Sequence, residues 1–163
     1  MIPTRVFILL LLITQSCANK PATQEYPDIV IEDGYSYKYD LNNEIYFVTI
    51  MGDPQSPTQV KFKLSEDEKK AIKDKFYEIG LNSVANDEYI EDQCYIMPQI
   101  LTTLTLKKKD KSIKIEIEES CNAYYTFNFL KAKKIKEFTS MVRNIVRAKP
   151  EVKNAPKSNA FYL

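Results

Sequence analysis

Histidine and tryptophan are absent from this chain of 163 residues, and glycine occurs only three times. Without an imidazole the chain has no Ser-His-Asp triad, no Cys-His nucleophile, and no zinc or haem ligated by histidine. Three glycines are too few for a glycine-rich loop that cradles phosphate groups. These absences exclude the commonest catalytic and nucleotide-binding motifs.

The chain also lacks a strong net charge of either sign. Lysine and arginine number 23, aspartate and glutamate number 22, and the formal net charge is +1. No broad basic field is present to hold nucleic acid, so we expect no nucleic-acid partner. Hydrophobic residues make up 44% and charged residues 28% of the chain, which is typical of a globular protein. The length suits a single domain.

The first 17 residues have the pattern of an export signal. Arg5 is the sole charge, and an unbroken apolar run follows from Val6 to Ile13. That run is far shorter than the roughly 20 residues that a membrane-spanning helix needs, but it suits the apolar region of a signal peptide. A small residue, Ser16, then directly precedes Cys17. This pattern resembles the lipobox of bacterial lipoproteins.

The resemblance implies that residues 1–16 are a signal peptide and that Cys17 is the lipidated first residue of the mature chain. Removal of Arg5 with the leader leaves 22 basic and 22 acidic side chains, so the mature chain is formally neutral. Residues 17–27 are polar, contain two prolines, and are predicted to be a tether. An ordinary secretory peptide cut elsewhere, with Cys17 incidental, is the alternative.

This reading predicts a location and a membrane partner. We expect a protein of the Gram-negative cell envelope, anchored by lipid in the outer membrane and facing the periplasm. No acidic cluster follows Cys17, so no tag for export to the cell surface is evident.

Two cysteines remain once Cys17 carries lipid. An even remainder in an exported chain predicts one disulfide, between Cys94 and Cys121. A redox-active pair is the alternative, but such pairs usually have Cys-x-x-Cys spacing. Two cysteines without a histidine do not make a convincing metal site, and we expect neither metal nor cofactor.

Alternation of apolar and polar residues predicts strands in two groups. The predicted strands cover residues 35–40, 44–51, 60–64, 99–107 and 112–118, with a further short strand at Tyr125, Phe127 and Phe129. We expect irregular structure over residues 82–98. The order of elements is similar to that of small metalloprotease-inhibitor domains of the emfourin type. Similarity in the order of elements alone does not allow a function to be inferred.

Two helices complete the predicted fold. Ser65 and Glu68 form a capping box, Gly80 suits a left-handed C-terminal cap, and a second helix covers residues 131–148 before Pro150. We therefore predict a single α+β domain over residues 28–149, with order βββα-ββ(β)α. Five to six antiparallel strands are expected to form one sheet, with both helices packed on one face. Residues 150–163 are predicted to be a loose tail.

The 11 tyrosines suggest an interaction surface. Tyrosine supplies contact area at a low entropic cost. The candidate surface comprises Tyr35, Tyr37, Tyr39, Tyr124 and Tyr125. Sheet packing with exposed hydroxyl groups is the alternative.

Clustered charges offer three further candidates. The carboxylates of Asp87, Glu88, Glu91 and Asp92 suit calcium but lack EF-hand spacing, so a solvated loop is the alternative. Glu116, Glu118 and Glu119 could act on glycan as a carboxylate pair, or they could form cross-strand ion pairs. The lysine-rich turn 107–111 could contact anionic lipid or simply aid solubility, and the lysines of 131–136 are expected to be solvated.

The expected function is non-enzymatic. An envelope lipoprotein with one small histidine-free domain is suited to binding an envelope protein, as an inhibitor or partner, or a small ligand. One alternative is a carboxylate-dependent hydrolase acting on cell-envelope glycan. The other is a passive structural subunit of an envelope complex.

Overall fold

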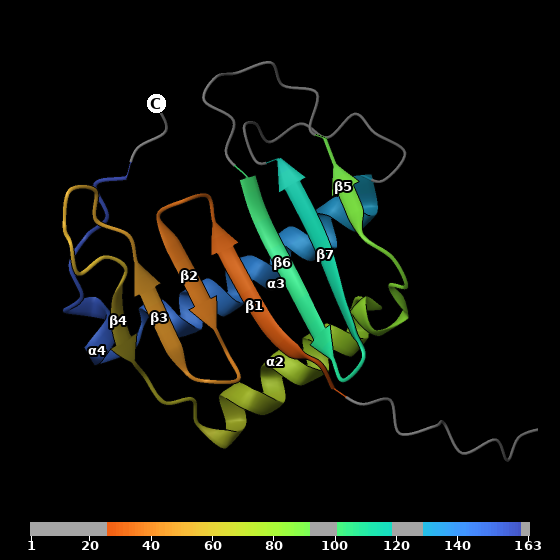
Figure 1. Ribbon diagram of the computed structural model, residues 1–163. Coiled ribbons are helices and arrows are strands. Elements are labelled where there is room, and N and C mark those ends of the chain that lie inside the picture. The colour runs from red at the N-terminus through yellow and green to blue at the C-terminus, as the bar shows by residue number, and fades with distance from the viewer. Residues whose placement is uncertain (1–25, 92–100, 119–128, 161–163) are drawn as a thin grey trace, which may run out of the picture.

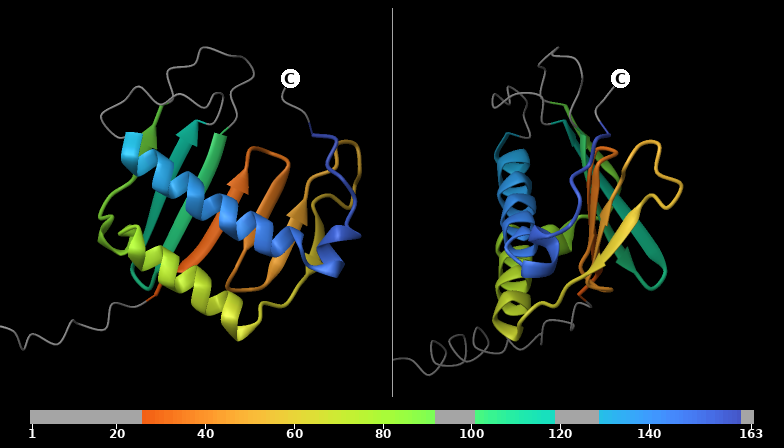
Figure 2. Two further views of the ribbon diagram at one scale, coloured as in Figure 1. Left: turned by 180° about the vertical axis from the view of Figure 1, so that it is seen from behind. Right: turned by 90° about the vertical axis from the view of Figure 1, so that its left-hand side faces the viewer.

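The computed structural model describes residues 26–91, 101–118 and 129–160, which form one mixed α+β unit. A seven-stranded sheet makes one layer, and two long helices lie side by side across one of its faces (Figures 1 and 2). The predicted α+β class is confirmed. Within the described ranges, none of the helices is long and apolar enough to cross a membrane.

The sheet is larger than the five to six strands that we predicted. Its strands are β1 (Asp28–Asp33), β2 (Tyr37–Asp40), β3 (Ile45–Val48), β4 (Thr58–Lys61), β5 (Glu88–Ile90), β6 (Leu101–Lys108) and β7 (Lys111–Glu118). They lie in the order β4-β3-β2-β1-β6-β7-β5. All neighbouring strands are antiparallel except β5, which runs parallel to β7. The expectation of a purely antiparallel sheet was therefore wrong.

The unpredicted strand β1 lies at the centre of the sheet, between β2 and β6. Ile29 and Ile31 are buried under the helices, and Val30 is buried on the opposite face. A strand buried on both faces reads as a continuous apolar run rather than an alternating one. The alternation of apolar and polar residues that indicated β2, β4 and β7 is therefore lacking in β1.

Among the described residues, four helical segments accompany the sheet: α2 (Glu66–Glu78), η1 (Leu81–Ser83), α3 (Phe129–Arg147) and α4 (Pro150–Lys153). The predicted capping box is confirmed, because the Ser65 side chain accepts from the Glu68 N–H and the Glu68 carboxylate accepts from the Ser65 N–H. Gly80 adopts the predicted left-handed conformation, with φ of 79°. A residue with a Cβ would be strained there.

The core lies between the two helices and one sheet face. Phe76 of α2 and Phe138 of α3 are fully buried and meet edge to face, with ring centroids 6.3 Å apart. The sheet contributes a continuous apolar row, because Tyr39, Ile31, Leu104 and Ile115 are successive register partners. Burial of this row by α2 and α3 stabilises the packing of helices against sheet.

Residues 150–160 differ from the loose tail that we expected. Pro150 ends α3 as predicted, but it then occupies the first turn of α4, where its missing N–H costs nothing. Val152 is buried, and the Ser158 hydroxyl donates to the carbonyl of Thr49 at 2.6 Å. The segment is thus held against the sheet by specific contacts.

Two further local predictions need correction or fall outside the described structure. Phe129, expected in a short strand, is the first residue of α3, and residues 88–90 of the supposedly irregular segment form β5. The described residues do not include Cys17, Cys94, Cys121, Tyr124, Tyr125, Phe127 or Glu119. The lipidation and disulfide predictions therefore stay predictions.

Candidate functional site

A hollow of about 470 Å³ lies between the sheet and α2, at the end of the domain where the described chain begins. Its walls are the start of β1, the loop between β2 and β3, and the first half of α2. Eleven residues line it: Tyr26, Pro27, Asp28, Ile29, Leu41, Asn42, Glu44, Leu64, Lys69, Ile72 and Lys73. The volume falls within the range of small-molecule sites in proteins.

The hollow combines an apolar floor with a charged rim. Ile29, Leu64 and Ile72 are almost completely buried and supply the floor. Lys69 and Lys73 lie along the α2 wall, whereas Asp28 and Glu44 belong to the sheet side. Opposite charges therefore flank an apolar surface, which suits a ligand that has an apolar body and polar groups of both signs.

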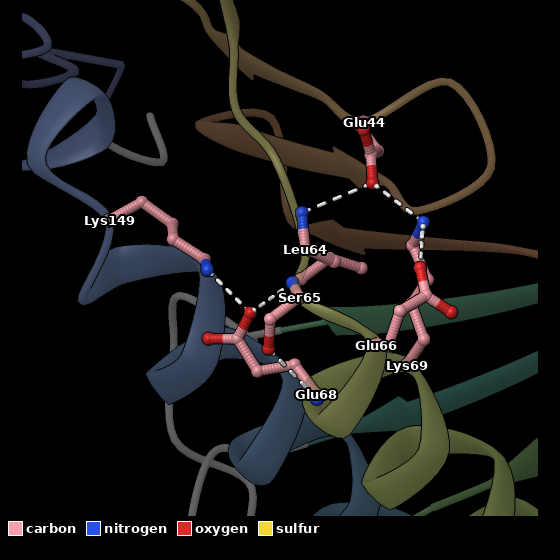
Figure 3. A network of polar contacts seen from close by, with 7 residues as sticks. All are labelled: Glu44, Leu64, Ser65, Glu66, Glu68, Lys69 and Lys149. Atoms are coloured by element: carbon pink, nitrogen blue, oxygen red, sulfur yellow. Dashed lines mark hydrogen bonds and ion pairs between the residues drawn. The ribbon is translucent and has the colours of Figure 1, made fainter.

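Glu44 has an unusual backbone conformation for this rim. Its φ is 52°, in the left-handed region that residues other than glycine, asparagine and aspartate seldom adopt. The carboxylate accepts a hydrogen bond of 3.1 Å from the Leu64 N–H and lies 3.6 Å from the Lys69 ammonium (Figure 3). These contacts tie the β2–β3 loop to the start of α2, and they compensate the backbone strain.

A second group of polar contacts fixes the start of α2 beside the hollow (Figure 3). Lys149, between α3 and α4, donates to the Glu68 carboxylate at 2.5 Å, in addition to the capping box with Ser65. The Lys149 ammonium holds the pKa of the Glu68 carboxyl below its usual range, with the Ser65 contacts acting in the same direction. The α2 wall of the hollow is therefore rigidly positioned.

Tyr26 closes the hollow where the chain enters the domain. Its ring meets that of Phe76 edge to face at a centroid separation of 5.2 Å, and burial raises the pKa of its hydroxyl well above the ordinary value. The Lys73 ammonium lies 5.9 Å from the centroid of the Tyr26 ring, within the range of a cation–π contact. The described part of the chain therefore begins at the edge of the hollow.

The structure separates the tyrosines of the predicted interaction surface. Tyr39 is fully buried and accepts a hydrogen bond of 2.8 Å from Arg147, while Tyr37 stacks on Tyr46 with ring centroids 5.8 Å apart. Both therefore pack on the helix-covered face, and the Tyr39 hydroxyl is buried, unlike the exposed hydroxyl groups of the alternative. Tyr35, in the β1–β2 turn, is 80% exposed and remains a candidate contact residue.

Partly buried charges next to these tyrosines stabilise the fold. Arg143 binds the Asp33 carboxylate through Nε at 2.8 Å and Nη2 at 2.6 Å, and it donates to the Thr102 hydroxyl at 2.6 Å. Arg147 approaches the other Asp33 oxygen at 3.3 Å. This cluster joins α3 to β1 and β6, and sequence patterns offered no signal for it.

Of the four candidate calcium ligands, Asp92 lies outside the described residues, and two of the others have separate structural partners. Asp87 accepts from the backbone N–H of Lys114 at 2.8 Å, and Glu88 forms an ion pair with Lys131. Over residues 26–91, 101–118 and 129–160, no three side chains of histidine, cysteine, aspartate or glutamate gather as a metal site. The contacts of Asp87 and Glu88 are those of an ordinary surface segment, which was the alternative to a calcium site.

Glu116 and Glu118 both lie on the sheet face that the helices leave uncovered. Glu116 pairs with Lys114 of its own strand at 2.6 Å, so the expected cross-strand partner was wrong. Glu118 is buried and accepts from the hydroxyl of Tyr89, and this hydrogen bond raises the pKa of Tyr89 to about 12. The two carboxylates thus have separate structural partners.

The chain matches no protein-family model, no curated protein and no solved structure. The functional argument therefore depends on the residues themselves.

Sequence reasoning missed the hollow because its walls come from segments up to 47 positions apart. One local signal was present: the Asn42–Asn43 pair is typical of a turn, but nothing in it indicated that Glu44 would face Lys69.

Proposed function

We propose that this protein is a lipid-anchored lipoprotein of the Gram-negative envelope whose domain binds a partner without catalysing a reaction. Cys17 carries the lipid, and the domain is held at the outer membrane on its periplasmic side. The hollow beside Tyr26 is the binding site. It accepts a small ligand, or an apolar side chain and its neighbours from an envelope protein that this domain inhibits or assists.

The residues that line the hollow are the observation that supports a binding function. An apolar floor bounded by Lys69 and Lys73 on one side and by Asp28 and Glu44 on the other supports binding of a dipolar ligand with an apolar body. The chain has no histidine to act as a base near neutral pH. The Glu44 carboxylate is already held by the Leu64 N–H and the Lys69 ammonium.

The lipid anchor is tested by metabolic labelling with palmitate. We expect label on the wild-type protein and none on the Cys17→Ala variant, because Cys17 is the lipid-bearing residue in the lipobox pattern. Label that persists after this substitution would contradict the anchor.

The hollow is tested by photo-crosslinking in native membranes. A benzoylphenylalanine at position 73 is expected to give a discrete adduct, because Lys73 lines the hollow. The same group at position 70 is the matched control, because Lys70 is on the same helix but outside the hollow and 74% exposed. The adduct should be lost in an Asp28→Lys variant. Equal crosslinking at both positions would refute the binding site.

A hydrolase is the second candidate function, because two carboxylates line the hollow. A glycoside hydrolase needs a carboxylate pair at a fixed separation in a cleft, and Asp28 and Glu44 both line this one. Release of reducing ends from cell-envelope glycan, abolished by Glu44→Gln, would favour that reading over binding alone. A passive structural subunit would show neither glycan release nor an adduct specific to position 73.

A further inference from the structure

The β6–β7 hairpin has a basic tip at the same end of the domain as the hollow. Residues 107–111 contain four lysines and one aspartate. In the sheet register Lys107 lies opposite Asp28, the first residue of β1. Figure 1 shows the β6–β7 turn next to the start of β1, where the chain enters the domain. The basic tip thus lies beside the attachment point of the predicted tether.

The lysines of the tip differ in their contacts. Lys111 is tied to the η1–β5 connection, because its ammonium donates to the carbonyl of Ala85 and lies 3.4 Å from the side-chain oxygen of Asn86. Within the part of the chain that the structure describes, Lys107 and Lys108 form no ion pair. Two cations at the hairpin end are therefore available for a partner outside the chain.

We propose that the basic tip, residues 107–111, contacts the anionic phospholipid headgroups of the membrane in which Cys17 is anchored. The inference rests on the proposed lipid anchor. Tyr26 follows Cys17 by nine positions, so the tether keeps the domain entrance within about 30 Å of the bilayer. At that range the tip meets lipid headgroups at a high effective concentration, and each lysine strengthens the contact about five-fold.

Contact between the basic tip and the lipid headgroups orients the domain relative to the membrane. A basic patch adds electrostatic attraction for anionic lipids to the membrane binding that acyl chains provide. Asp28 both lines the hollow and pairs in register with Lys107. When the tip lies on the bilayer, the Asp28 side of the hollow is the side nearest to the membrane surface.

Lysine footprinting of the mature protein tests the contact. The full acylated chain is placed in nanodiscs of phosphatidylcholine alone or of phosphatidylcholine with phosphatidylglycerol, and the acetylation rate of each lysine is read by mass spectrometry. We expect Lys107 and Lys108 to react about five-fold more slowly in the anionic discs. Lys153 and Lys157 are internal controls whose rates should be the same, because they lie toward the opposite side of the domain. Equal rates for Lys107 and Lys108 in both discs would overturn the proposal.

Matched variants separate a lipid contact from a change in structure. The Lys107→Glu/Lys108→Glu variant should lose the phosphatidylglycerol-dependent protection of Lys109, whereas Lys153→Glu/Lys157→Glu should keep it, with unchanged circular dichroism in both. If palmitate labelling fails, the proposed anchor is wrong. The acetylation rates of the unlipidated full chain, mixed with the two kinds of disc, then test the lipid contact of the tip independently of the anchor. Protection that survives the first variant would refute the role of these lysines.

Discussion

Removal of the Asp33 carboxylate should destabilise the domain strongly. Asp33 and Arg143 are 17% and 13% exposed, and two of their hydrogen bonds are 2.6 and 2.8 Å long. Removing one partner of a buried pair costs about 3–5 kcal/mol, because the other charge is left without compensation. Since the Asp33 side chain retains some contact with water, we expect Asp33→Ala to lower the free energy of unfolding by about 3 kcal/mol.

The neighbouring residue supplies the matched control. Glu32 is next to Asp33 on β1 but points to the uncovered sheet face, where it pairs with Lys38 at 3.1 Å. These two side chains are 37% and 41% exposed, so Glu32→Ala should cost less than about 1 kcal/mol. The two substitutions remove an ion-paired carboxylate from the same strand and differ mainly in burial.

Urea unfolding and thermal unfolding, each followed by circular dichroism, measure both variants. For a domain of this size we expect Asp33→Ala to lower the melting temperature by about 10 °C, since each kcal/mol corresponds to roughly 3–4 °C. The slope of the urea transition should stay unchanged if both variants unfold from the same native state. The reasoning fails if Asp33→Ala costs no more than Glu32→Ala.

Three further outcomes are expected. Ser65→Ala should lower stability by about 1 kcal/mol in urea unfolding, because it removes the cap of α2; a loss below a few tenths would contradict the capping role. The pKa of Glu68 is lowered in the folded state by Lys149, so its stabilisation is present above the unfolded pKa of about 4.3 and is lost as pH falls through the folded value. Glu68→Gln should therefore reduce the acid-dependent loss of stability below about pH 5, and an unchanged pH profile would argue against this linkage. Alkylation of the exported protein under denaturing, non-reducing conditions should label neither Cys94 nor Cys121, whereas two free thiols would refute the predicted disulfide.

The elements that could be predicted are those whose signals are local. The capping box of α2 joins Ser65 to Glu68, three positions away, and Gly80 ends the same helical segment. The β6–β7 hairpin was recognisable because apolar residues alternate along both strands. The central strand β1 was not, because burial of Val30 on the uncovered face removes the alternation.

The sequence alone determined the α+β class, the two long helices, the absence of imidazole chemistry, and the expectation of an exported, lipid-bearing N-terminus. Only the tertiary structure decided the strand order, the parallel pairing of β5 with β7, the Glu44–Lys69 contact in the hollow, and the place of Lys107 beside Asp28. The physical reason is the range of the interactions. Caps, turns and periodicity involve residues a few positions apart, whereas backbone hydrogen bonds between strands are nearly independent of side chains. Their partners are therefore selected by the burial of the whole core.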